Sequence, residues 1–388
     1  RELKICITNC RYESVKRSAL KYGFKEVDEK DDWNLYWTDL SVCIERVMQM
    51  KRYQKINHFP GMTELCRKDL LAKNLARMQK LFPNDYNFFP KSWCLPADYS
   101  DLLAHAKEKK NQTYILKPEG GCQGKGIWIT KSLSKINPKE HKFCQQYISK
   151  PFLIDGYKFD LRIYVLLTSC DPFRIFVYNE GLARFATIEY EMPSLNNYNN
   201  LFMHLTNYSI NKSNEEFDRS NENGSKRKLS TLNEWFEMNG YNTVELWKKI
   251  DDIIIKTLIS VHSVLCHNYR TCFPHPIKGG CACFEVLGFD VVLDRKLNPF
   301  VLEVNHSPSF FTDSQVDGEV KDSLIYDTLC LINFRATTKK SCDIEDKEKI
   351  RCRLITSDPS KQLCIIIRKN IVMWFVINYF VFIYSTDS

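Results

Sequence analysis

Residues 283–309, CFEVLGFDVVLDRKLNPFVLEVNHSPS, contain two apolar runs that flank a polar turn. The turn, residues 294–299, holds charged residues and an Asn-Pro pair, which are typical of an exposed chain reversal. We therefore predict an antiparallel β-hairpin centred on residues 296–297. Its register pairs residues of the two strands directly: Gly288 with Asn305, Asp290 with Glu303, and Val292 with Val301.

The polar residues of this hairpin are predicted to share one face. Side chains two residues apart on a strand point the same way, so Asp290, Glu303 and Asn305 should project together. Two facing carboxylates on otherwise apolar strands are costly unless a cation neutralises them. Oxygen ligands of this kind suit Mg²⁺ that also holds phosphates. The alternative on the pattern alone is an exposed acidic face on an ordinary hairpin.

A second segment, YILKPEGGCQGKGI at residues 114–127, combines four glycines with two lysines. Glycine lets the backbone approach a polyanion closely, and Lys117 and Lys125 supply positive charge, which favours phosphate binding. The segment is not a Walker loop, because Gly126 stands where that motif requires Ser or Thr. The same residues also fit a flexible hairpin with no ligand.

Two further stretches carry polar groups in a regular pattern. In KFDLRIYVLLT, residues 158–168, Lys158, Asp160 and Arg162 alternate with apolar residues, so one strand face is dry and the other is charged. That charged face fits a nucleotide cleft or a solvated edge with its own salt bridge. The stretch at residues 204–209, HLTNYS, fits a site loop or local turn capping.

Composition and periodicity indicate a globular α+β protein. The chain has 388 residues, 44% of them hydrophobic, and a net charge of +8, which exclude a disordered or collagen-like polymer and favour an acidic partner. Its 16 cysteines lack the spacing of a disulfide scaffold, so we expect reduced thiols in the cytosol. We expect a strand then a helix at residues 3–22, antiparallel strands at 158–168 and 173–178, a loop over 193–240, and one helix over 244–268.

Taken together, these segments resemble the tubulin tyrosine ligase-like family, and closely its polyglutamylase branch. The segments that carry the resemblance are LKPEGGCQGKGI, KFDLRIYV, HLTNYS, CFEVLGFDVVLDRKL and FVLEVNHSPSF, and it extends from about Cys6 to about Asn333. The resemblance implies an ATP-grasp fold in which antiparallel sheets enclose ATP. The domains expected are residues 1–91, 92–152 and 153–338, followed by a divergent apolar tail at 339–388.

The resemblance also implies an activity. The expected reaction is ATP-dependent ligation of free L-glutamate onto glutamate side chains or chains in the acidic tails of tubulin, through an acylphosphate and of the elongation type. The alternatives are a catalytically silent microtubule-binding splice form, or a glycylase or other ATP-grasp ligase acting on another acidic protein. We expect a monomer in the cytoplasm and on the cytoskeleton, including the cilium, axoneme or basal body. Neither nucleic acid nor a membrane contact of the tail is expected.

Site residues follow from the resemblance, position by position. The implied magnesium ligands, for two ions, are Asp290, Glu303 and Asn305, and the implied catalytic residues are Arg162 and Glu303. The implied ATP contacts are Lys117, Gln123, Gly124, Gln145, Gln146, Tyr147, Ile148, Lys158, Phe159, Asp160, Thr206 and Asn207. The incoming amino acid is expected at Arg184, Ser209, Lys226 and Arg227, and the acceptor chain at Gln123 and His306.

Overall fold

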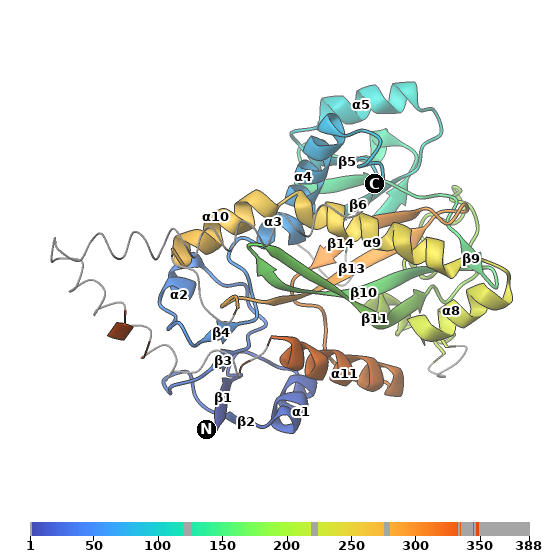
Figure 1. Ribbon diagram of the computed structural model, residues 1–388. Coiled ribbons are helices and arrows are strands. Elements are labelled where there is room, and N and C mark those ends of the chain that lie inside the picture. Colours follow the sequence, from blue (N-terminus) through green and yellow to red (C-terminus); the bar gives the residue numbers. More distant parts are fainter. Residues whose placement is uncertain are drawn as a thin grey trace, which may run out of the picture. The chain divides into compact units, whose positions relative to one another are not determined.

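The computed structural model describes residues 2–118, 126–218, 224–274 and 280–332, with residues 334, 344, 347 and 348 besides. The chain divides into two units, residues 1–333 and 334–388. Three separate sheets and the helices around them make the first unit an α+β structure (Figure 1). The Gly-rich bend with Gln123 and Gly124, and nearly all of the apolar tail, lie outside the described residues.

The first sheet is small and parallel. Its strands are β1 (Leu3–Cys6), β2 (Phe24–Glu26), β3 (Leu35–Tyr36) and β4 (Lys55–Ile56), in the order β2-β1-β3-β4. Helix α1 (Glu13–Tyr22) ends at Gly23, whose φ of 103° supplies the left-handed cap that glycine favours. The predicted strand–helix opening is therefore confirmed. Three further helices, α2 (Ile44–Met48), α3 (Thr63–Cys66) and α4 (Lys68–Leu81), complete this region.

The second sheet is antiparallel, with strand order β5-β8-β6-β7. Its strands are β5 (Ser92–Leu95), β6 (Tyr114–Pro118), β7 (Trp128–Thr130) and β8 (Lys142–Gln146). Helix α5 (Tyr99–Glu108) adds Leu102 to a small core with Trp93 and Tyr114 from the sheet. A short 3-10 helix, η1 (Leu133–Lys135), lies between β7 and β8.

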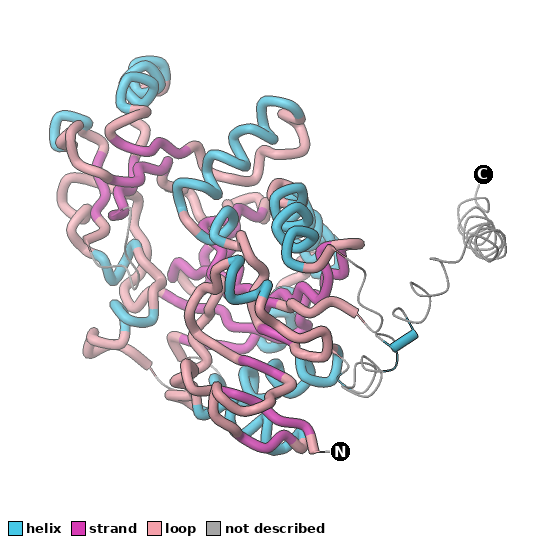
Figure 2. The backbone as a smooth tube through the Cα atoms, turned by 90° about the vertical axis from the view of Figure 1, so that its left-hand side faces the viewer, coloured by secondary structure: helices cyan, strands magenta, loops and turns pink. Residues whose placement is uncertain are grey.

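The third sheet is the largest and is antiparallel along the path β12-β11-β10-β13-β14. These strands are β10 (Tyr157–Cys170), β11 (Phe173–Phe185), β12 (Lys226–Lys228), β13 (Glu285–Leu293) and β14 (Pro299–Asn305), and β9 (Leu153–Ile154) pairs with β10. Alternate residues of β10 and β13 pack into the main core, as predicted for a strand with one dry face. Figures 1 and 2 show helices on both sides of this sheet.

Two sequence-based expectations about helices were wrong. Residues 193–240 are not one loop, since they contain α6 (Leu201–His204), α7 (Tyr208–Asn211), β12 and α8 (Leu229–Met238). The expected helix over 244–268 is two helices, α9 (Thr243–Ile259) and α10 (His262–Cys272). At the break, Ser260 Oγ donates to the carbonyl of Thr257 at 2.6 Å, and such local hydroxyl bonds compete with continued helix.

The β13–β14 hairpin follows the predicted register only near its open end. Asp290 lies opposite Glu303 and Gly288 opposite Asn305, as predicted, but Val301 lies opposite Val291 rather than Val292. A β-bulge accounts for the shift, because Leu302 is an extra residue in β14. As a result Val301 and Val304 both pack in the core, while Leu302, Glu303 and Asn305 face a pocket on the opposite side.

The last described helix, α11 (Gln315–Leu331), packs beside α1, far from it in sequence (Figure 1). Arg17 of α1 donates to both carboxylate oxygens of Asp322 in α11 at 2.9 Å. Among the described residues, none of these helices is long and apolar enough to cross a membrane.

Candidate active site

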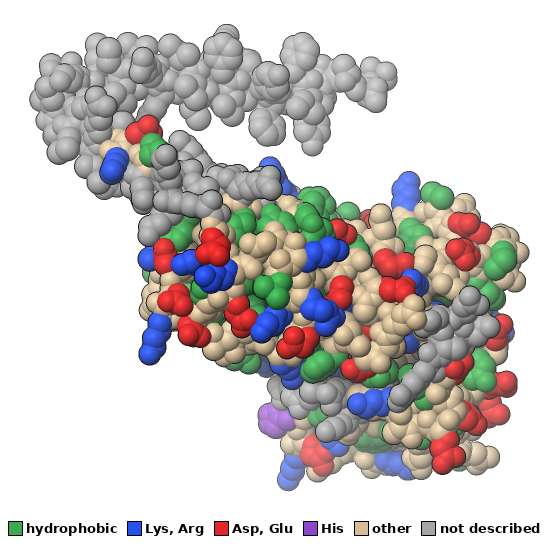
Figure 3. Space-filling view, turned by 90° about the horizontal axis from the view of Figure 1, so that it is seen from below, with side chains coloured by type: hydrophobic (Ala, Val, Ile, Leu, Met, Phe, Trp, Pro, Cys, Tyr) green, Lys and Arg blue, Asp and Glu red, His purple; other side chains and the backbone are tan. Residues whose placement is uncertain are grey.

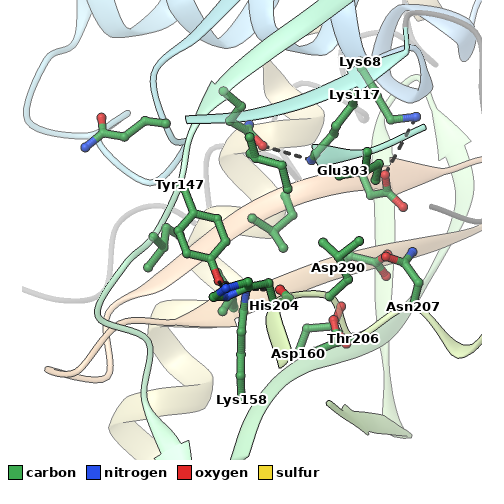
Figure 4. Close-up of a pocket in the computed structure, with 18 of the residues that line it drawn as sticks. Lys68, Lys117, Tyr147, Lys158, Asp160, His204, Thr206, Asn207, Asp290 and Glu303 are labelled. Carbon is green, nitrogen blue, oxygen red and sulfur yellow. Dashed lines mark hydrogen bonds and ion pairs between the residues drawn. The ribbon is translucent and has the colours of Figure 1, made fainter. Parts of the chain in front are cut away.

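A pocket lies between the second and third sheets, and loop 204–207 forms part of its wall (Figure 4). The structure brings together most of the residues that the sequence assigned to nucleotide and metal. Those that line the pocket are Lys117, Gln145, Gln146, Tyr147, Ile148, Lys158, Asp160, Thr206, Asn207, Asp290, Glu303 and Asn305. Apolar side chains complete the lining, namely Ile115, Ile127, Leu205, Val292 and Leu302. A mixed lining of this kind can hold a flat apolar group next to an anionic one.

Two buried lysines supply positive charge to the pocket. Lys117 donates to the side-chain oxygen of Gln145 at 3.0 Å. Lys158 donates to the carbonyl of His204 at 2.7 Å and to the hydroxyl of Tyr147 at 3.1 Å, and it lies 4.5 Å from the centre of that ring. Neither ammonium group forms an ion pair with a carboxylate of the described chain. An anion in the pocket would therefore meet two cations whose charge is not yet neutralised.

Burial lowers the pKa of both lysines, and it lowers that of Lys158 to about 7. His204, which accepts from or donates to the Tyr147 hydroxyl at 3.1 Å, has a pKa lowered to about 4 by burial and by the nearby Lys158. His204 is therefore neutral near pH 7. Because an added negative charge favours protonated lysine, a polyanion in the pocket would raise the pKa of Lys158.

The three residues that were predicted to bind magnesium lie on β13 and β14, in the same sheet as Lys158. Glu303 and Asp290 come from adjacent strands (Figure 4), and Glu303 lies 3.9 Å from the ammonium of Lys68. Asn305 donates its amide nitrogen to the carbonyl of Gly288 at 3.3 Å, which leaves the amide oxygen as its available ligand atom.

These three side chains supply only some of the ligands that a magnesium ion needs. In the described ranges no group of three or more His, Cys, Asp or Glu side chains could hold a metal alone. Two carboxylates and one amide oxygen match a magnesium ion that completes its shell with phosphate oxygens and water. The chemistry of the donor set therefore fits such an ion when a nucleotide is bound.

Behind the pocket wall, two arginines and two aspartates form an alternating buried cluster. Arg162 contacts Asp290 at 2.5 and 3.0 Å, and Arg184 contacts Asp290 at 2.9 Å. Arg184 also donates to both oxygens of Asp160, at 2.8 and 2.5 Å. Burial by itself would raise the pKa of Asp290 and lower the pKa values of both arginines. The neighbouring opposite charges outweigh burial, so the pKa of Asp290 is lowered and those of Arg162 and Arg184 are raised.

This cluster corrects one premise of the sequence-based interpretation. The facing carboxylates were expected to need a metal for neutralisation, but Asp290 is already paired with Arg162 and Arg184. Among the described carboxylates of the pocket, Glu303 is the one that lacks a close partner, since its contact with Lys68 is a distant one. The cluster fixes the Asp290 carboxylate in place, so that it can present its oxygens in one orientation.

The residues expected to bind the incoming amino acid lie beyond this cluster. Lys226 on β12 lies opposite Arg184 on β11 in the strand register. Its ammonium lies 2.5 Å from the carboxylate of Asp317 and 3.9 Å from the ring centre of Tyr208. Arg227 stacks 4.2 Å from the ring of Phe185, and Ser209 lies in α7. The structure thus brings Arg184 and Lys226 together, although none of these four residues lines the pocket itself.

Sequence reasoning missed Lys321 and Asp317 in α11. The ammonium of Lys321 lies 2.7 Å from Asp317 and donates to the carbonyl of Phe311 at 2.6 Å, so Asp317 sits between two lysines. Burial lowers the pKa of Lys321 to about 8. The available signal was a charged pair spaced four residues apart, which alone looks like an ordinary surface pair.

Three other predicted residues do not line the pocket, namely Arg162 of the buried cluster, Phe159 and His306. Phe159 stacks on Phe185 at 5.2 Å in the main core, because strand alternation turns it away from Lys158 and Asp160. Its side chain therefore belongs to the core rather than to the pocket. His306 follows the pocket residue Asn305 and lies 2.9 Å from the Ser41 hydroxyl, and Gln123 and Gly124 are among the residues that the structure does not describe.

Comparison with known proteins places this chain in a family. The family model of the tubulin-tyrosine ligase family matches residues 46–342, and the chain belongs to that family. Three curated relatives are similar over most of the chain. The mouse protein named tubulin polyglutamylase TTLL13 is 63% identical over 355 residues, which cover 91% of this chain and 44% of that protein.

The other two relatives carry the same activity in their names. Zebrafish tubulin polyglutamylase ttll6 is 60% identical over 353 residues, covering 91% of this chain and 45% of the relative. Mouse tubulin polyglutamylase TTLL7 is 42% identical over 365 residues, covering 92% of this chain and 40% of the relative. The chain therefore spans less than half the length of these proteins.

Proposed function

We propose that this chain is an ATP-dependent ligase of the ATP-grasp type that adds L-glutamate to glutamate side chains or chains in the acidic tails of tubulin. The observation that carries the proposal is the pair of buried lysines, Lys117 and Lys158, which line one pocket together with Asp290 and Glu303. Cations and oxygen ligands in the same pocket are what a magnesium nucleotide requires. The names of the relatives support the choice of tubulin and glutamate.

In this proposal the nucleotide occupies the pocket between the two sheets. The linker residues Gln146 and Ile148 and the apolar side chains around them hold the base, and Thr206 and Asn207 contact the sugar or phosphates. Burial lowers the pKa of both lysines, to about 7 for Lys158, and approaching phosphates would raise these pKa values and favour the protonated lysines. The same charges then stabilise negative charge that develops on the transferred phosphoryl group.

Glu303, Asp290 and Asn305 would hold magnesium against those phosphates. The ion would supply charge neutralisation and fix the phosphate geometry. The chain's own part is orientation: Arg162 and Arg184 lock Asp290, and the bulge at Leu302 turns Glu303 into the pocket. We expect two ions, as the family resemblance implies.

The donor glutamate is proposed to bind near Lys226 and Lys321, where two lysines flank Asp317. An incoming carboxylate could displace Asp317 from one of them, and Arg227 and Ser209 would contact the rest of the molecule. The acceptor carboxylate would attack the γ-phosphate of ATP and release ADP. The donor amino group would then attack the resulting acylphosphate, so that an amide bond forms and inorganic phosphate leaves. We place the acceptor chain beside His306 and propose elongation of chains as the preferred step.

A glycine donor is a weaker second candidate, because several cations surround the proposed donor position and glycine has only one carboxylate. A silent microtubule-binding form is disfavoured because the described residues expected to contact nucleotide or metal line the pocket. Phe159 is the exception among them, since its side chain lies in the core. The proposed setting is the microtubule cytoskeleton, with cilia among its sites. We propose that the protein acts as a monomer.

The test is incubation of the full chain with microtubules, Mg-ATP and labelled glutamate or glycine. We expect label from glutamate on intact microtubules and none on microtubules whose acidic tails have been cleaved. Label from glycine alone would refute the donor, and label on tail-less microtubules would refute the acceptor. The variant Glu303→Gln serves as the inactive control, because its substitution removes one proposed metal ligand from a partly exposed position.

A further inference from the structure

A second hollow lies on the far side of the linker that follows β8. It shares Gln146, Tyr147 and Ile148 with the first pocket and has a volume of about 830 Å³. Tyr147 points its ring toward the first pocket (Figure 4), so the linker forms a wall between the two spaces. The remaining walls come from α4, the segment before β5, the loop after α5, the residue after β7, residues 192–193 and the β13–β14 turn. Nothing in the proposed reaction uses this hollow.

Positive charge dominates its lining. Five cations, Lys91, Lys131, Lys150, Arg295 and Lys296, surround it, and we call this hollow the basic groove. All five are exposed, and none forms an ion pair with another residue in the part of the chain that the structure describes. The ammonium of Lys91 lies 5.6 Å from the ring centre of Trp93, a contact that leaves its charge in place.

Among the described residues that line the groove, Asp294 is the single acid, and it is committed to its own turn. Its carboxylate accepts from the backbone of Lys296 and Asn298 at 2.8 Å each, and from the Asn298 side chain at 3.0 Å. It therefore folds the turn and has little capacity left to neutralise the five cations. The basic groove therefore carries an excess of positive charge that its described lining residues do not offset.

Backbone hydrogen bonds join the segment that carries Lys150 to the turn that carries Arg295 and Lys296. The backbone nitrogen of Arg295 donates to the carbonyl of Lys150 at 3.0 Å, and that of Phe152 donates to Leu293 at 2.8 Å. Elsewhere on the surface, cations and acids are interspersed, as on the face seen in Figure 3. On that general surface Lys16 pairs with Glu26 and Arg17 with Asp322. The groove is thus a local departure from this mixture of charges.

We propose that the basic groove binds an acidic polypeptide segment, such as a glutamate-rich stretch of the substrate protein that is not itself being modified. The proposal rests on the proposed function for the identity of its partner. The side-chain amides of Gln79, Asn87 and Gln112 also line the groove and can pair with peptide groups. Docking a second part of an acidic chain there would raise the local concentration of acceptor at the reaction site.

A peptide fits these walls better than a nucleic acid. Single-stranded nucleic acids are held by exposed aromatic rings on which bases stack. The two phenylalanines of the groove, Phe89 and Phe300, are only partly exposed, and Phe89 packs against the main core. Four of the five cations are lysines, which act as point charges and suit a flexible row of carboxylates.

The test compares two triple variants of the full chain that lose the same charge. In the groove variant Lys131, Lys150 and Lys296 become Gln, and in the control variant Lys30, Lys107 and Lys248 become Gln. The control lysines are also exposed and form no ion pair with a described residue. Fluorescence anisotropy measures binding of a labelled oligo-glutamate peptide without nucleotide. We expect the groove variant to bind about tenfold more weakly and the control variant to stay within about twofold of the native chain.

Two outcomes would overturn the proposal. One is equal weakening in both variants, which would mean that net charge alone binds the peptide. The other is tighter binding of a single-stranded RNA of matched charge than of the peptide. As an independent readout, bound peptide should protect Lys150 and Lys296 from acetylation but leave Lys107 reactive. Because these measurements need no turnover, a failure of glutamate transfer would count against the proposed function and leave the groove result standing.

Discussion

Removing the charge of Asp290 should destabilise the protein strongly, whereas removing that of Glu303 should not. Both are proposed magnesium ligands, but Asp290 has a side chain only 4% exposed and contacts two arginines, while Glu303 is 25% exposed and lies 3.9 Å from Lys68. At an effective dielectric constant of about 20, one charge pair at 2.9 Å is worth roughly 6 kcal/mol before desolvation. The net loss for Asp290→Asn should be ~3–5 kcal/mol, because two buried guanidinium groups are left with one carboxylate.

Urea unfolding followed by tryptophan fluorescence measures this difference. Glu303→Gln is the matched control, and it should change the free energy of unfolding by less than about 1 kcal/mol, since exposed or distant pairs contribute little. Both variants should lose most glutamate transfer. If Asp290→Asn unfolds at the same urea concentration as the native chain, the alternating cluster does not stabilise the fold, and our account of how Asp290 is held would be wrong.

A pocket lysine and a tightly packed glycine provide two further tests. ATP binding between about pH 7 and 9 should take up a proton, because Lys158 has a pKa lowered to about 7 and phosphates raise it; calorimetry in buffers of different ionisation enthalpy should detect this, and Lys158→Met should abolish it. Gly181→Ala should cost ~1–3 kcal/mol of unfolding free energy, because its Cβ would lie 2.5 Å from the Arg162 carbonyl, whereas Gly318→Ala has open space and should be neutral or stabilising in the same assay.

Much of the site could be predicted from strand alternation. The residues at spacing two in β10 and β13 share a face, so Lys158 and Asp160 reach the pocket while Leu161 and Phe289 pack in the core. Alternation is local, and a local pattern is sufficient to define it. The pairing of Asp290 with Glu303 was also predicted, but it results from the observed register at the turn together with the bulge at Leu302.

What the sequence could not provide depends on contacts between distant segments. The partnership of Arg184 with both Asp160 and Asp290 requires three strands to come together, and nothing in any one strand indicates it. Lys321 contacts Asp317 within α11, but this pair lies beside Lys226 only because α11 packs on the large sheet. The bulge was invisible for a different reason, since Leu302 fits a regular strand as well as it fits an insertion.

The inserted Leu302 limits how the hairpin can vary. Strict alternation would have put Val301 on the same side as Glu303. A strand shortened by one residue would therefore either remove a valine from the core or turn the carboxylate away from the pocket. With the insertion, the neighbouring residues Leu302 and Glu303 contribute an apolar side chain and a carboxylate to the same pocket. Deletion of one residue here would therefore impair both the packing of the core and the position of Glu303. A substitution of equal size at position 302 would change only the lining of the pocket.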